Sequence, residues 1–79
     1  MTTARNVVLA SLENRFADQC VDIFIRPDGT FGFEEFRRDP EDCGQWRNLD
    51  RFSHLSFSTQ EKALEAAHEN VPWLEKRFL

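Results

Sequence analysis

The chain has 79 residues, of which 41% are hydrophobic and 30% charged, including eight phenylalanines and two tryptophans. This length supports one domain, 1–79, and the aromatic content excludes a disordered chain. Fourteen acidic residues against ten basic ones give a net charge of −4, which disfavours nucleic acid and anionic lipid as partners. The longest apolar run, Val7–Ala10, is too short to span a membrane. Two cysteines make no disulfide framework, so we expect a cytoplasmic protein.

The first segment predicts an amphipathic helix over about residues 3–19. Val8, Leu12 and Phe16 recur at a spacing of four, and polar residues such as Glu13 fill the opposite face. We therefore expect this segment to bury one apolar stripe against the core.

Residues 21–34 predict a β-hairpin around Pro-Asp-Gly at 27–29, a type I turn closed by a glycine in the left-handed region. The resulting register pairs Phe24 with Gly32, where the ring can lie over a residue without a side chain. The core face of the hairpin carries Val21, Ile23, Ile25, Phe31 and Phe33. The other face carries Asp22, Phe24, Arg26, Thr30, Gly32 and Glu34.

The second half predicts a long loop, a strand and a helix. Residues 37–51 have no periodicity and contain Pro40 and Gly44, so we expect a loop. Weak alternation predicts a third strand over about 53–57. A capping box beginning at Ser58 predicts a helix that ends near Asn70.

These elements predict an α+β fold, an α-β-β-β-α two-layer sandwich with a three-stranded antiparallel sheet and both helices on one face. We expect residues 72–79 to form a docked C-terminal tail. The expected core contains Val8, Leu12, Phe16, Val21, Ile23, Ile25, Phe31, Phe33, Leu55, Phe57, Leu64, Ala67 and Trp73. The other sheet face would have no cover, and uncovered aromatic groups are typical of a binding surface.

The candidate binding site lies on that open face and in the 37–51 loop. It consists of Phe24, Arg26, Phe36, Arg38, Trp46 and Arg47. Aromatic and arginine side chains together suit a protein partner or stacked bases. The competing interpretation is that the loop folds over the face and buries the rings. A second candidate is an anion clamp, with Arg37, Arg38, Arg47 and Arg51 as its members. Acidic residues are interleaved with these arginines, which favours local ion pairing instead.

No pattern predicts catalytic residues, a metal site or a cofactor. Cys20, Cys43, His54 and His68 are the candidate metal ligands, but no two of them have a metal-binding spacing. Cys43 with His54 as its base is an equally unsupported nucleophile. We expect Cys20 to be a buried apolar group and His68 a packed residue at the core edge.

The predicted element order resembles the topology of the double-stranded-RNA-binding domain. In that family the second helix opens with lysines that contact phosphates, whereas residues 58–62 here hold one lysine, Lys62. The resemblance therefore implies no function for this chain.

The sequence thus predicts a small non-enzymatic cytoplasmic binding or accessory domain. It would make protein–protein contacts through the open sheet face, with another protein or a second copy of itself as the partner. The alternative is a nucleic-acid-binding module that uses the same aromatic and arginine surface.

Overall fold

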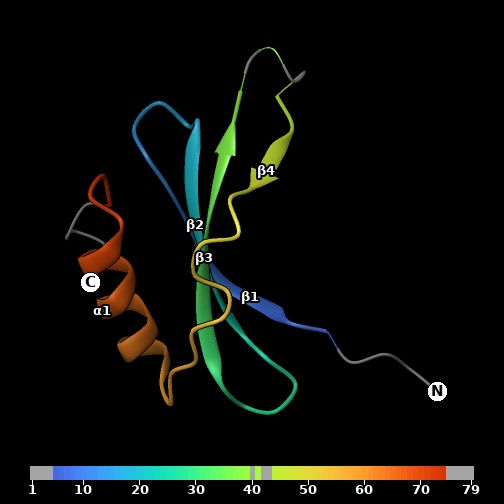
Figure 1. Ribbon diagram of the computed structural model, residues 1–79, viewed down its shortest axis with the longest axis vertical. Coiled ribbons are helices and arrows are strands. Elements are labelled where there is room, and N and C mark those ends of the chain that lie inside the picture. Colours follow the sequence, from blue (N-terminus) through green and yellow to red (C-terminus); the bar gives the residue numbers. More distant parts are fainter. Residues whose placement is uncertain (1–4, 40, 42–43, 75–79) are drawn as a thin grey trace.

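The computed structural model describes residues 5–39, 41 and 44–74 (Figure 1). Four strands form one antiparallel sheet in the order β1-β2-β3-β4, and one helix follows them. The elements are β1 (Val7–Glu13), β2 (Gln19–Ile25), β3 (Phe31–Arg38), β4 (Trp46–Asn48) and α1 (Gln60–Asn70). The helix lies against one side of the twisted sheet (Figure 1), where it contacts β2 and β3. The predicted three-stranded sheet with two helices is therefore wrong, although the fold is still α+β with an open sheet face.

The segment predicted as the first helix forms β1, which pairs with β2. Ala10 and Leu12 point to the core side at a spacing of two, opposite Ile23 and Val21. Leu9 has no partner residue in β2, and this bulge shifts the alternation by one residue. The bulge places Val8 on the open face and Leu12 on the core face. Their spacing of four residues matches a helix, but pairing with β2 overrides that local pattern.

The predicted β2–β3 hairpin is confirmed. Phe24 pairs with Gly32 and the far end of the register pairs Asp22 with Glu34. The Gly29 amide donates to the Arg26 carbonyl at 2.9 Å, and Gly29 has a φ of +88°, a conformation that glycine adopts at no steric cost. The predicted core face of the hairpin is the face that α1 covers.

The expected long loop contains parts of two strands. Residues 37–38 belong to β3, and β4 pairs antiparallel with the end of β3, from Phe36 with Asn48 to Arg38 with Trp46. Residues 53–57 do not form a strand, because only one isolated bridge joins Phe57 to Phe31. This segment instead runs beside β3 where β4 has ended, and it carries the chain to α1 (Figure 1).

The predicted end of the helix is confirmed, but its cap is shifted by one residue. The N-cap is Thr59, whose hydroxyl accepts from the Lys62 amide at 3.1 Å, rather than Ser58. At the other end Val71 is extended, and its amide donates to the Ala67 carbonyl at 2.8 Å.

The core lies between α1 and the sheet. It consists of Val21, Ile23, Phe33, Ala63, Ala67, Val71 and Leu74. Val8 and Phe16, which we expected in the core, are 51% and 76% exposed, because β1 turns Val8 to the open face and Phe16 lies in the β1–β2 turn. Trp73 packs against the core as predicted. The last part of the expected docked tail, 75–79, lies outside the described residues.

Candidate functional site

The open face of the sheet carries five of the six residues in the predicted binding site. Phe24 and Arg26 lie toward the β2–β3 turn, while Phe36, Arg38 and Trp46 lie toward the other end. Arg47 is on the opposite face, because it follows Trp46 in β4 and pairs with Arg37. The two ends of the open face differ in how much of their surface is covered by other residues of the chain.

At the first end, Phe24 is only 7% exposed. The Arg26 guanidinium lies 5.0 Å from the centre of the Phe24 ring. Arg26 Nη2 donates to the carbonyls of Ser53 and Leu55 at 2.7 and 2.9 Å. A Cβ on Gly32 would lie 2.7 Å from Arg26 Nη2 and 2.9 Å from two atoms of the Phe24 ring. Arg26 therefore fastens the segment before α1 to the sheet, and Phe24 itself presents little exposed surface.

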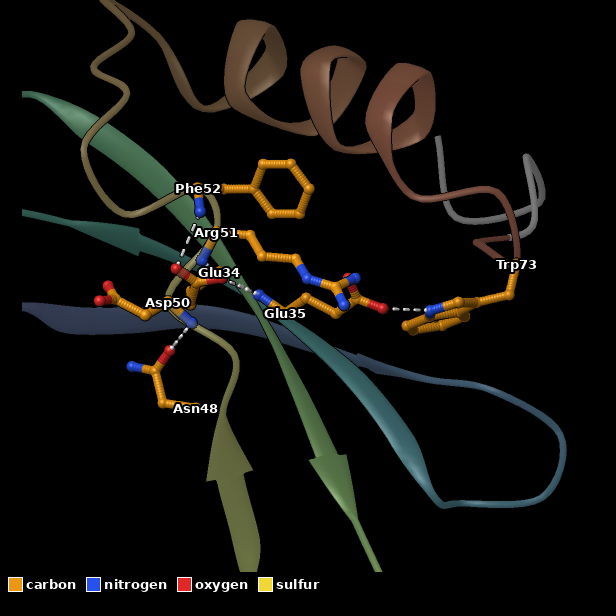
Figure 2. A network of polar contacts seen from close by, with 7 residues as sticks. All are labelled: Glu34, Glu35, Asn48, Asp50, Arg51, Phe52 and Trp73. Atoms are coloured by element: carbon orange, nitrogen blue, oxygen red, sulfur yellow. Dashed lines mark hydrogen bonds and ion pairs between the residues drawn. The ribbon is translucent and has the colours of Figure 1, made fainter.

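A buried carboxylate, Glu34, holds the chain that follows β4 (Figure 2). Its Oε1 accepts from the amides of Phe52 and Ser53 at 3.0 and 2.9 Å and from the Ser53 hydroxyl at 2.7 Å. Its Oε2 accepts from the amides of Glu35 and Arg51 at 2.7 and 3.1 Å. Burial raises the pKa of Glu34, but the bonds from Ser53, Phe52, Glu35 and Arg51 outweigh burial and hold the pKa below its ordinary value.

The neighbouring Glu35 points to the helix side and connects two distant segments. Its Oε1 lies 3.3 Å from Arg51 Nη1, and its Oε2 accepts from the Trp73 indole nitrogen at 2.8 Å (Figure 2). Arg51 is thus engaged by a carboxylate, while Arg38 lies on the open face and Arg37 and Arg47 on the other face. The structure does not bring the four arginines of the predicted anion clamp together.

At the other end of the open face, aromatic surface is exposed. Trp46 is 38% exposed, and Phe36 is half-buried. The Arg38 guanidinium lies 4.6 Å from the centre of the Trp46 ring, and its Nη2 donates to the Ala17 carbonyl at 2.6 Å. Arg38 therefore connects β3 and β4 to the β1–β2 turn and supports the Trp46 ring from one side.

Two cavities of about 210 Å³ each adjoin on this face and share Asp22 and Phe36 in their walls. The first is lined by Ser11, Glu13, Cys20, Asp22, Phe36 and Trp46. The second is lined by Asn6, Val8, Asp22, Phe24, Glu34, Phe36, Asn48 and Ser53. The open face is therefore hollowed, and its walls combine aromatic rings with carboxylates.

Sequence reasoning missed the outer edge of the sheet and the acidic side of the face. Val7, Val8 and Leu9 in β1 are 58%, 51% and 41% exposed, and consecutive β-branched valines were a signal for a strand. Glu13 lies on the open face because of the register of β1 with β2, which the helix prediction concealed. Asp22 lies on the same face, where the hairpin register predicted it.

The candidate metal ligands that lie among the described residues, Cys20, His54 and His68, form no metal site. Cys20 is buried beneath the first cavity, and burial followed by the charges of Asp22 and Glu13 raises the pKa of its thiol to about 12. His54 is exposed, and Cys43 lies outside the described residues. The His68 ring nitrogens are buried without a hydrogen-bond partner among the described residues. No group of three or more histidine, cysteine, aspartate or glutamate side chains in the described ranges could hold a metal ion.

No family model, curated protein or solved structure matches this chain. The β-β-β-β-α order also removes the topological resemblance to the double-stranded-RNA-binding domain. No helix in the described part of the chain combines the length and the apolar character needed to cross a bilayer.

Proposed function

We propose that this chain is a small non-enzymatic binding domain that holds a protein partner on its open sheet face, with an extended segment of the partner lying along β1. The observation that carries the proposal is that β1, the outer strand, has an unpaired edge and exposed apolar side chains. In the described part of the chain β1 has a strand partner on one side only, and Val7, Val8 and Leu9 are exposed. Strand addition to such an edge is a recurrent mode of peptide recognition.

The β1 edge is continuous with the open face. Val8 belongs to β1 and also lines the second cavity together with Phe36. Alternate side chains of a strand added beside β1 would point to this face, next to Val8, Ser11 and Glu13. One partner segment would therefore gain main-chain hydrogen bonds at the edge and side-chain contacts on the face.

Charge complementarity favours a basic segment as the partner. The chain has a net charge of −4, and Glu13 and Asp22 both line the first cavity. A second copy of the chain would bring the same net charge, and a nucleic acid would bring phosphates to these carboxylates. The same proposal includes a cytoplasmic location, for which the support is the small number of cysteines and the free thiol of Cys20.

The test uses the full chain and a synthetic peptide in which arginine alternates with valine. Backbone amide shifts in NMR should change along β1 and around Phe36 when this peptide is added, and much less with a peptide that carries glutamate for arginine. Val8→Lys should weaken binding, because it places a repelling charge on the edge. Phe16→Lys is the matched control, with the same charge change at an exposed apolar residue outside β1.

Equal binding by both variants would refute the role of β1. Failure of the arginine peptide to bind, together with salt-dependent binding of single-stranded DNA or RNA, would favour the nucleic-acid alternative. A concentration-dependent dimer that Val8→Lys alone dissociates would replace the basic partner with a second copy.

A further inference from the structure

We infer that the first cavity of the open face binds the cationic end of a lysine or arginine side chain. That the side chain belongs to a protein partner rests on the proposed function. That the cavity binds a cation does not. The volume of about 210 Å³ is several times the roughly 30 Å³ of a water molecule. It accommodates a guanidinium or ammonium group with its adjoining methylenes.

The register of the sheet sets aromatic walls beside carboxylates. Glu13 of β1 pairs with Cys20 of β2, and Cys20 pairs with Phe36 of β3, so these residues form one row across the open face. Asp22 lies in the neighbouring row, opposite Ser11. Trp46 of β4 completes the lining on the far side. A cation in this space would lie near carboxylates and aromatic rings together, and both kinds of group attract a positive charge.

Both carboxylates have acceptor capacity left. Asp22 Oδ1 accepts from the Ser11 hydroxyl at 2.7 Å and from the Cys20 thiol at 3.4 Å, which orients the group. Asp22 Oδ2 accepts no hydrogen bond from a described residue, and the Glu13 carboxylate has no hydrogen bond or ion pair with one. Each carboxylate oxygen can accept two bonds, so a donor with several N–H groups fits the pair.

The carboxylates of Asp22 and Glu13 in the cavity wall attract a cation and repel an anion. Burial contributes most to the raised pKa of the Cys20 thiol, about 12, and the charges of Asp22 and Glu13 raise it further. The part that comes from these two charges favours a cation, whereas burial disfavours a charge of either sign. Arg38 is the nearby positive charge, but it is bonded to Ala17 and stacked on Trp46, and it does not line the cavity.

The test uses N-acetyl-arginine amide and N-acetyl-lysine amide as probes, with the citrulline amide as the uncharged isostere of the arginine probe. Titrations followed by NMR should show saturable shifts of the Trp46 indole and Cys20 amide signals. The affinity for the arginine or lysine probe should be about tenfold above that for citrulline. Comparing the affinities of the two cationic probes shows which of the two side chains the cavity binds more tightly. Added salt should weaken binding of the cations.

Glu13→Gln should reduce the affinity for the cationic probes several-fold, because it removes a charge without removing a hydrogen bond. Glu65→Gln, which makes the same change at an exposed position on α1, should leave the affinity unchanged. Equal affinity for citrulline and arginine, or an unchanged affinity in Glu13→Gln, would overturn the inference. If the probes bind but the peptide does not pair along β1, this inference stands and the proposed function is refuted. If the peptide pairs along β1 but the probes do not bind, the proposed function stands and this inference is refuted.

Discussion

Replacing Glu34 by glutamine tests the hydrogen-bonding role assigned to its carboxylate. The carboxylate accepts five hydrogen bonds, whereas the glutamine amide has one acceptor oxygen. If that oxygen stays at the Oε1 position, the amides of Glu35 and Arg51 lose their acceptor, at about 1 kcal/mol each. The three remaining bonds fall from charge-assisted to neutral, which adds about 1 kcal/mol more. We therefore expect Glu34→Gln to lower the free energy of unfolding by about 3 kcal/mol near pH 7, of a total of roughly 4–12 kcal/mol.

The assay is urea unfolding followed by far-ultraviolet circular dichroism, with Glu65→Gln as the control that stays within about 0.5 kcal/mol of wild type. Because the pKa of Glu34 is lowered in the folded state, its contribution is fully present above the unfolded pKa of about 4.3 and is lost as the pH falls through the folded value. The difference in unfolding free energy between wild type and Glu34→Gln should thus narrow as the pH falls below the unfolded pKa of glutamate. A loss below 1 kcal/mol at pH 7, or a difference independent of pH, would refute the reasoning.

Three further substitutions test other parts of the fold by the same unfolding assay. Arg26→Lys should cost about 1–3 kcal/mol, because one ammonium cannot reproduce bonds from two nitrogens, Nη2 to the carbonyls of Ser53 and Leu55 and Nη1 to the Phe31 carbonyl and the Ser56 hydroxyl. Wild-type stability would contradict this role. Gly32→Ala should cost about 1–3 kcal/mol through the close approach of Cβ to Arg26 and Phe24, and the additional change Phe24→Leu should recover part of that loss. Phe16→Ser should change stability by less than about 0.5 kcal/mol, because this ring is 76% exposed, whereas a large loss would restore a core position for Phe16.

The hairpin and the last helix were predictable because their signals are local. A Pro-Asp-Gly turn fixes the register from Asp22 to Glu34, and a capping residue with a following proline brackets α1. The first strand was not predictable in the same way, because the apolar residues Val8, Leu12 and Phe16 also fit a helical spacing. Only pairing with β2, a contact between separate segments, decides between the two conformations.

The candidate site was predictable in its location but not in its composition. The hairpin register alone placed Phe24 and Arg26 on the uncovered face, while the burial of Phe24 depends on contacts between Arg26 and the distant residues 53–56. Glu34 gave no local signal, because its hydrogen bonds come mainly from backbone amides of residues 51–53. The place of Glu13 in the acidic wall of the first cavity required β1 to be recognised as a strand.

The segment that follows β4 makes the two edges of the sheet unequal in their capacity to pair with a further strand. Beside the first half of β3, residues 49–57 occupy the position of a further strand and are fastened there by Glu34 and by the bridge from Phe57 to Phe31. Beyond that segment β4 is three residues long, which is short for templating another chain. In the described part of the chain β1 is therefore the longer edge open to a further strand, and two copies that meet through this edge would form a closed pair.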